Sequence, residues 1–183
     1  MSKLILLCGV PHCGKTTIIR NYCRDYCGEP ERVSSNKITK ESFDVYTYET
    51  GMKIFYDSTD ERRNIPRFLP LYSKKKDCNI LFHQPYWDKP GLTKFLFEMS
   101  KYRDIHIISI NNDTKITKSR LNKTPTYDDI IEIEERQSFY NLMRQQLLSK
   151  YTCHDVKNET WDDYENIIEL IKTLDKEEIL SYT

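Results

Sequence analysis

The feature that most constrains this chain is a short segment near its N-terminus that holds two of its five glycines. Residues 9–16 match the pattern G-x-x-x-x-G-K-[ST], in which the glycines let the backbone fold around a phosphate group. The apolar run at residues 3–8 predicts a buried strand before the segment, and the apolar spacing of residues 16–26 predicts a helix after it. The N-terminus of such a helix attracts anions. We therefore expect a phosphate-binding loop made of Gly9, Val10, Pro11, His12, Cys13, Gly14, Lys15, Thr16 and Thr17.

Three side chains have predicted roles around the bound phosphates. Lys15 is expected to reach the β- and γ-phosphates of a nucleoside triphosphate, which also makes it a candidate catalytic residue. The hydroxyl of Thr16 is a candidate ligand for Mg²⁺. Asp57 follows a predicted strand at residues 53–56, where a carboxylate can face the metal ion. The sequence thus predicts a nucleotide that binds together with Mg²⁺.

Short apolar strands alternate with amphipathic helices along the chain. The turn at Thr50 and Gly51 predicts a β-hairpin, and Thr126 with Asp129 resembles a capping box that opens a long helix. This order predicts one α/β domain over residues 1–183, with a six-stranded, mostly parallel sheet and helices on both faces. The strand at residues 43–48 is expected to be antiparallel, and residues 29–41 and 111–126 to be loops. The other strands are predicted at residues 3–8, 52–56, 78–82, 105–110 and 151–156, and the helices at 16–26, 91–102, 126–150 and 161–174.

Charge and hydropathy exclude several classes of protein. The chain has 28 Lys and Arg residues against 28 Asp and Glu residues, whereas a general binder of nucleic acid or anionic membranes needs a basic excess. No apolar run approaches the roughly 18 residues of a membrane helix. The apolar start is too short for a signal peptide, and the C-terminus has no prenylation cysteine. We expect a cytoplasmic protein without nucleic-acid partners or a stable membrane anchor.

The phosphate loop and the element order together resemble the small GTPases of the Ras superfamily, the Rab-like branch most of all. The hairpin at residues 43–56 corresponds to the hairpin after the first switch of that family. The next segment is similar to the family's D-T-A-G-Q-E-R motif and reads Asp57-Ser58-Thr59-Asp60-Glu61-Arg62-Arg63. The resemblance implies a P-loop NTPase fold that binds GTP or GDP with Mg²⁺ and contacts a protein partner through a switch-like surface.

The resemblance also implies further site residues. Glu61 falls where the family has its water-positioning glutamine, which makes Glu61 a candidate catalytic residue. Thr39 is nearest to the first-switch threonine that binds Mg²⁺ in the family. The family reads guanine with the motif N-K-x-D, of which Asn111 is retained. Thr114 stands at the aspartate position of that motif, and Asp113 lies one residue before it.

Three functions are compatible with these features. The first is a divergent GTPase-like protein that prefers GTP to ATP and acts through protein partners, with weak or absent hydrolysis because Asp60 places a carboxylate beside the γ-phosphate. The second is a small P-loop kinase that phosphorylates a nucleotide or another small acceptor. The third is a nucleotide-free pseudo-GTPase that serves as a scaffold. The kinase is favoured by the start Gly9-Val10-Pro11 and by a basic run that could clamp phosphates, formed by Lys115, Lys118, Arg120 and Lys123.

Overall fold

The computed structural model describes residues 1–34, 42–56, 65–74, 77–83, 89–121 and 124–177. Its centre is a seven-stranded sheet in the order β2-β3-β4-β5-β1-β6-β7. Strand β3 runs antiparallel to both of its neighbours, and all other pairs are parallel. The expected α/β fold with a mostly parallel sheet is therefore confirmed. The strands are β1 (Lys3–Gly9), β2 (Glu31–Ser34), β3 (Ser42–Thr47), β4 (Lys53–Phe55), β5 (Ile80–His83), β6 (Asp104–Ile110) and β7 (Thr152–Val156).

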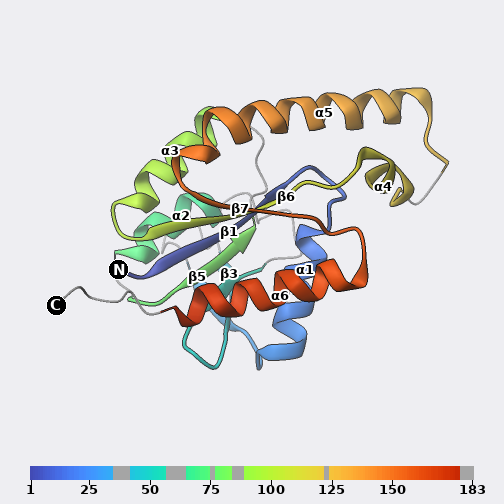
Figure 1. Cartoon of the computed structure of the whole chain (residues 1–183). Helices are drawn as coiled ribbons and strands as arrows, with labels where there is room; N and C mark the ends of the chain where they lie inside the picture. The colour runs from blue at the N-terminus through green and yellow to red at the C-terminus, as the bar shows by residue number, and fades with distance from the viewer. Residues whose placement is uncertain (35–41, 57–64, 75–76, 84–88, 122–123, 178–183) are drawn as a thin grey trace.

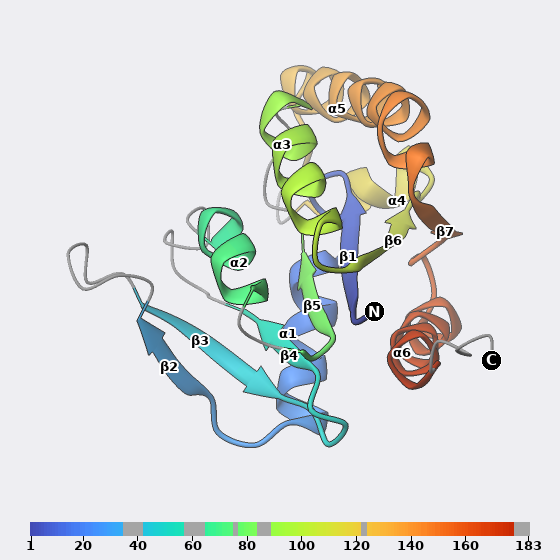
Figure 2. The ribbon, with the colours of Figure 1, turned by 90° about the vertical axis from the view of Figure 1, so that its left-hand side faces the viewer.

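Helices cover both faces of this sheet, as the sequence predicts (Figure 1). On one face lie α1 (Lys15–Tyr26) and α6 (Trp161–Lys176). On the other face lie α2 (Ile65–Ser73), α3 (Lys89–Ser100) and α5 (Tyr127–Gln146), and Figure 2 shows the three of them arranged along the sheet. The short helix α4 (Thr114–Ser119) follows the carboxyl end of β6, and a 3₁₀ turn (Leu148–Lys150) follows α5.

Strand β1 is the middle of the hydrophobic core. All seven of its residues are buried, and it pairs with β5 on one side and with β6 on the other. A strand that is covered on both faces needs apolar side chains at every position rather than at alternate ones. The continuous run of Leu4, Ile5, Leu6 and Leu7 meets this need, and each of these side chains is fully buried. The buried strand predicted before the phosphate loop is confirmed.

The sheet has one strand more than the six that the sequence predicts. The additional strand is β2, which pairs antiparallel with β3 at the edge of the sheet, where the sequence predicts a loop. It is only four residues long, and Glu31 and Arg32 are exposed. An edge strand with so little burial has no apolar alternation, so the sequence carries no signal for it. The hairpin next to it has the predicted form, with β3 antiparallel to β4 and Gly51 in the turn at φ 93°.

The order of the strands separates the hairpin from the phosphate loop. Strand β5 lies between β4 and β1, so the strand that ends beside β1 is β5, with His83 opposite Leu7. Neighbouring strands are about 4.8 Å apart, which places the end of β4 about 10 Å from β1. Asp57, the candidate metal ligand after the predicted strand at residues 53–56, lies outside the described residues.

Two helix starts illustrate how local capping shapes the fold. The capping box predicted for the long helix is present, because Thr126 accepts from the backbone N–H of Asp129 and the Asp129 carboxylate accepts from that of Thr126. Helix α4 lies where the sequence predicts a loop, and Asp113 caps it by accepting from the N–H of Lys115 at 2.8 Å.

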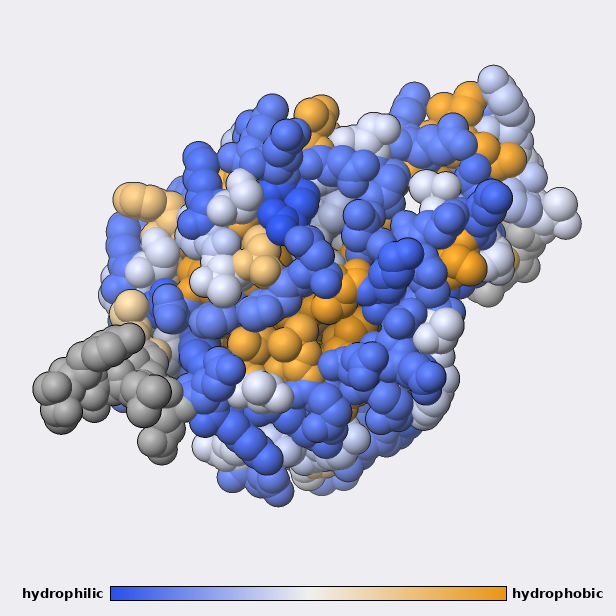
Figure 3. All heavy atoms as spheres, in the orientation of Figure 1, coloured by the Kyte–Doolittle hydropathy of each residue, from blue (hydrophilic) through white to orange (hydrophobic). Residues whose placement is uncertain are grey.

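Figure 3 shows a mostly polar surface on the face of Figure 1, with an apolar patch near its middle. Among the described residues, no helix is long and apolar enough to cross a membrane.

Candidate functional site

The loop between β1 and α1 is shaped by two glycines that no other residue could replace without strain. Gly14 precedes α1 with φ 101°, and a Cβ atom there would collide with the side-chain nitrogen of Asn158. Gly9 has φ 157°, and a Cβ atom there would lie 2.8 Å from the carbonyl oxygen of Ile110. His12 also has a positive φ, 67°, which non-glycine residues rarely adopt. The loop therefore has the tight, inward-folded backbone that a phosphate cradle needs.

Lys15 lies inside this loop rather than in solvent. Its ammonium group donates to the carbonyl oxygens of Gly9 at 2.5 Å and of Val10 at 2.9 Å, and it lies 3.6 Å from the sulfur of Cys13. The residue is only 9% exposed. A phosphate group entering the loop would offer this buried cation charged oxygens in place of neutral carbonyls, and charge-assisted hydrogen bonds are the stronger ones.

Two residues from distant parts of the chain support the loop from outside. The guanidinium group of Arg120 donates to the carbonyl oxygen of Cys13 at 3.2 Å and to that of Asn158. Asn158 in turn donates from its side chain to the Cys13 carbonyl at 3.0 Å, and its backbone N–H donates to Asn112 at 2.7 Å. Asn158 is 8% exposed and Asn112 is 5% exposed, so these bonds are shielded from water. The segments after β6 and β7 thus fix the conformation of the phosphate loop.

The floor of the site is apolar. Cys8, the last residue before Gly9, is buried beneath the loop, and Cys13 is buried within it. Burial raises the pKa of the Cys8 thiol far above its usual range, against the opposing charge of Lys15. The thiol of Cys8 is therefore neutral, and the Lys15 ammonium is the charge that the loop offers to a ligand.

A groove of about 770 Å³ runs along the outer side of the loop, between α1 and α6. We call it the α1–α6 groove. At its far end Trp161 is 70% exposed and stacks on Tyr164, with ring centroids 5.0 Å apart and an angle of 29° between the rings. The groove has the size of a ligand site and combines an anion-binding loop with an exposed aromatic face. Its lining is Pro11, His12, Gly14, Lys15, Thr16, Thr17, Ile18, Asn21, Arg120, Asn158, Glu159, Thr160, Trp161 and Tyr164.

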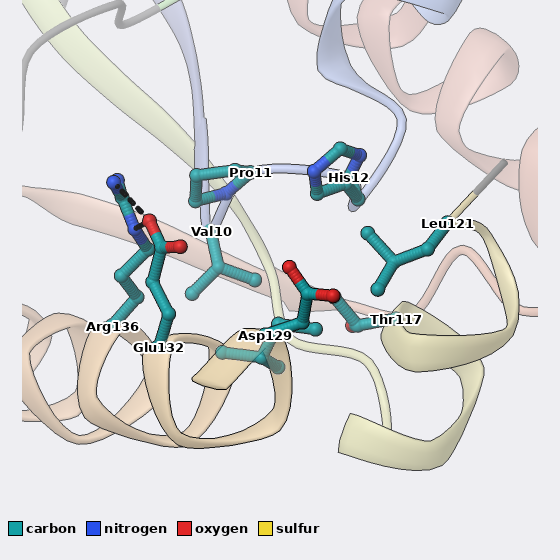
Figure 4. Close-up of a pocket in the computed structure, with 9 residues that line it drawn as sticks. Val10, Pro11, His12, Thr117, Leu121, Asp129, Glu132 and Arg136 are labelled. Atoms are coloured by element: carbon teal, nitrogen blue, oxygen red, sulfur yellow. Dashed lines mark hydrogen bonds and ion pairs between the residues drawn. The ribbon is translucent and has the colours of Figure 1, made fainter. Parts of the chain in front are cut away.

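A smaller pocket of about 190 Å³ opens on the other side of the loop, between the loop and helices α4 and α5 (Figure 4). We call it the α4–α5 pocket. Pro11 and His12 line both cavities, so the two meet at the start of the phosphate loop. The hydroxyl of Thr117 is buried in the wall of this pocket without a hydrogen-bond partner. The remaining lining is Val10, Leu121, Asp129, Glu132, Ile133 and Arg136.

The structure brings together most of the residues predicted to bind phosphate. Gly14, Lys15, Thr16 and Thr17 all line the α1–α6 groove, together with Pro11 and His12, while Val10 faces the α4–α5 pocket. Gly9 and Cys13 form the backbone of the loop behind them. Thr39, Asp57, Asp60 and Glu61, with roles taken from the resemblance to small GTPases, lie outside the described residues.

The two residues expected to read guanine have other hydrogen-bond partners. The Asn111 side chain accepts from Gln137 at 2.9 Å. The Asp113 carboxylate caps α4, and the backbone N–H of Asp113 donates to Glu159 at 2.6 Å. Neither residue is among the described residues that line the α1–α6 groove. Asn158 and Trp161 do line it, and no local pattern in the sequence marks either of them as a site residue. Arg120 is visible in the sequence only as a member of the basic run.

No protein-family model matches this chain, and no curated protein matches it either. Among solved structures, the tunicamycin resistance protein of Deinococcus radiodurans matches with a TM-score of 0.53 and 10% identity, over 93% of this chain and 96% of that one. A gluconokinase from Sinorhizobium meliloti 1021 (TM-score 0.48, 8% identity, 93% and 96% covered) and a shikimate kinase from Bacteroides thetaiotaomicron (0.45, 10%, 93% and 98%) also match. The first of these matches supports a shared fold, while the small-GTPase family implied by the sequence resemblance is not shown. The chain has the α/β fold of the P-loop NTPases.

Proposed function

We propose that this chain is a P-loop kinase, which transfers the terminal phosphoryl group of ATP to a small acceptor. The observation that carries this proposal is that the phosphate loop has a cavity on each side, and that both cavities include Pro11 and His12. Phosphoryl transfer to an acceptor needs two substrates on either side of the transferred group, roughly in line. A protein that only binds and hydrolyses a nucleotide needs one such cavity.

The residues of the loop suit the donor nucleotide. The backbone N–H groups of the loop, to which Pro11 contributes none, and the ammonium group of Lys15 would stabilise the charge that spreads over the transferred phosphoryl group. The Thr16 side chain lies in the first turn of α1 and lines the groove beside Lys15. A hydroxyl oxygen is a suitable ligand for Mg²⁺, so Thr16 would hold the ion against the phosphates. The ion, when bound, neutralises phosphate charge.

We infer ATP rather than GTP as the donor. Guanine recognition by the family motif requires a carboxylate that accepts two N–H bonds from the base, and the carboxylate of Asp113 instead caps α4. The exposed Trp161 in the groove offers a face on which any base can stack. The GTP-binding function and the switch-like protein partner implied by the small-GTPase resemblance receive no support from the described residues of the groove.

The first experiment measures equilibrium binding of fluorescent ATP and GTP, with and without Mg²⁺, followed by ADP formation with a mixture of small hydroxyl-bearing acceptors. The kinase proposal predicts Mg²⁺-dependent ATP binding, and ADP formation that rises when acceptor is added. Lys15→Ala should abolish both. Lys101→Ala is the matched control, because Lys101 lies after α3 and pairs with Glu98 at 2.9 Å, away from the site. Tight binding of GTP alone, or nucleotide turnover that no acceptor changes, would contradict the proposal.

A further inference from the structure

The outer faces of α3 and α5 carry an inference that does not depend on the proposed kinase function. Both helices lie on the side of the sheet opposite α1 and α6, so their outer faces lie away from the α1–α6 groove (Figure 2). We propose that these faces form the contact surface of a symmetric dimer, in which α3 of one copy packs against α5 of a second copy. Three observations support this partner: exposed apolar side chains, the charges beside them, and the positions of both along the two helices.

Large apolar side chains are exposed on both helices. Phe97 of α3 is 60% exposed, and Phe139 and Leu142 of α5 are 42% and 54% exposed. The outer side of a surface helix is normally polar, and neighbouring exposed apolar side chains indicate an interaction surface. A partner that covers these three side chains would remove their apolar area from water, which is the main favourable contribution to most protein association.

The charges beside these side chains are opposite on the two helices. The shallow groove beside Phe97 has two lysines and no carboxylate among the described residues that line it, which are Lys89, Pro90, Thr93, Lys94 and Phe97. The groove beside Phe139 is lined by Glu132, Glu135, Arg136 and Phe139. Arg136 pairs with Glu132 at 2.7 Å, so Glu135 gives this second groove a net negative charge. Two copies of the chain therefore attract each other when α3 faces α5, and repel each other when like helices meet.

The positions of the aromatic side chains fit a two-fold axis. Helix α3 begins beside the end of α5, because the ammonium group of Lys89 donates to the side-chain oxygen of Gln146 at 2.7 Å. A helix rises about 1.5 Å per residue, so Phe97 lies about 12 Å from this contact along α3 and Phe139 about 10 Å from it along α5. A two-fold axis near the contact would bring Phe97 of one copy to Phe139 of the other.

The same axis brings opposite charges together. Lys101 directly follows α3, about 18 Å from the contact with α5, and Glu135 lies about 16 Å from that contact along α5. Both residues are exposed, and the Lys101 ammonium group lies 4.7 Å from the centre of the Phe97 ring. In a two-fold interface residue i of one copy contacts residue j of the other and the reverse, so the dimer would contain the Lys101–Glu135 pair twice.

The first test measures the mass of the full chain by sedimentation equilibrium over a range of concentrations. We expect a species of twice the 21.9 kDa of one chain. Phe97→Asp and Phe139→Asp should each weaken dimerisation by at least about tenfold, because a carboxylate would be placed in an apolar contact. Trp161→Asp, at an exposed aromatic residue of α6, is the matched control and should retain the dimer. A wild-type chain that stays at 21.9 kDa at every concentration overturns the proposal, as does a dimer that either phenylalanine variant retains.

Reversed charges test whether α3 pairs with α5. Lys101→Glu and Glu135→Lys place like charges opposite each other, so each variant alone should dimerise at least about tenfold more weakly. A mixture of the two variants should recover the dimer, because the mixed pair of chains has one native and one reversed ion pair. Glu165→Lys, at an exposed position of α6, is the matched control, and circular dichroism checks that every variant is folded. A mixture that stays monomeric, or species that grow beyond two chains, overturns the two-fold arrangement.

Discussion

At the scale of single residues, the phosphate loop depends on the backbone conformation of Gly14 and on the side chain of Asn158 that supports it. Gly14 has φ 101° and Gly51 has φ 93°, so alanine at either position adopts a left-handed conformation at a cost of about 1–2 kcal/mol. The two positions differ in their surroundings. A Cβ atom at Gly14 meets the Asn158 side chain that supports the loop, while a Cβ atom at Gly51 meets nothing within 4 Å.

This difference gives a matched pair of substitutions. Gly14→Ala and Gly51→Ala should both lower the free energy of unfolding, by about 1–2 kcal/mol for the backbone alone. Only Gly14→Ala should also weaken ATP, by at least about tenfold, because it displaces Asn158 from the Cys13 carbonyl. Urea unfolding and equilibrium ATP binding measure the two effects. Equal ATP affinity in the two variants would show that the contact between Asn158 and the loop does not matter for ATP binding.

The residues of the site differ in how far the sequence could predict them. Lys15 and Thr16 belong to a contiguous motif whose geometry follows from local backbone rules, and both line the groove. Asn158 reaches the loop across 145 positions of sequence, through a single hydrogen bond to Cys13. No periodicity reports such a tertiary contact. The resemblance places Asp113 near a nucleobase, and it takes no account of the helix that this residue caps.

At the scale of secondary structure elements, α6 places an aromatic side chain where a base could stack. Trp161 is the first residue of α6, and it is held by stacking on Tyr164, one turn later. Because base stacking on an aromatic ring contributes about 1–3 kcal/mol, Trp161→Ala should weaken ATP by about 5- to 150-fold. The free energy of unfolding should change by less than about 0.5 kcal/mol, since the side chain is 70% exposed.

The control for this prediction is Phe97→Ala, which removes another exposed aromatic side chain, on α3. It should leave ATP affinity unchanged. Fluorescence provides a second readout, because the chain has two tryptophans and a Trp87→Phe variant leaves Trp161 as the only one. Emission from that variant should change on adding ATP. An unchanged spectrum together with wild-type affinity in Trp161→Ala would exclude the stacking role.

Strands β6 and β7 bring two histidines into contact and make stability depend on pH. His106 stacks on His154 with ring centroids 5.7 Å apart. Burial, followed by the charge of Lys3, holds the pKa of His106 below its ordinary value, although the carboxylates of Asp104 and Glu177 oppose this shift. The unfolded chain therefore binds more protons than the folded one just below pH 6.5, so folding stability must decrease as the pH falls through that value.

The corresponding measurement is urea unfolding at about pH 7.5 and about pH 5.5. The wild-type protein should lose stability at the lower pH, and His106→Gln should lose less of it, because the glutamine takes up no proton. Thr93→Val on α3, which changes no titratable group, is the control and should keep the wild-type pH dependence. A His106→Gln protein with an unchanged pH dependence would assign the effect to other groups.

Elements with a strong local signal are the ones that the sequence predicts. The capping box of α5 and the uniformly apolar run of β1 depend on neighbours within a few positions, and both are found in the structure. Strand β2 forms only because β3 offers it an edge, and its exposed Glu31 and Arg32 carry no pattern. Helix α4 has six residues, too few for a reliable period of 3.6.

At the scale of the whole molecule, the order of the strands decides which segments meet the phosphate loop, and this order is not local information. Alternation of strands and helices predicts a parallel sheet, but it leaves open whether β4 or β5 lies beside β1. The structure places β5 there. The resemblance to small GTPases rests in part on the hairpin, whose strand β4 lies about 10 Å from β1. The fold class could therefore be predicted correctly, while the neighbours of the site could not.

Ligand binding at the site should stabilise the whole fold. The phosphate loop joins β1, at the centre of the core, to α1, and it accepts hydrogen bonds from residues at the end of α4 and before the start of α6. A ligand that binds only the folded protein stabilises it by about 2.7 kcal/mol at 100 times its dissociation constant. For a domain of this length, this should raise the unfolding temperature by about 5–10 °C in Mg²⁺–ATP. Lys15→Ala should show no rise, while Lys101→Ala should show the full one. Adding to the Mg²⁺–ATP complex an acceptor that supports ADP formation should raise the temperature further, because direct transfer requires both substrates to be bound at once. Mutually exclusive binding of ATP and that acceptor would contradict direct transfer between the two cavities.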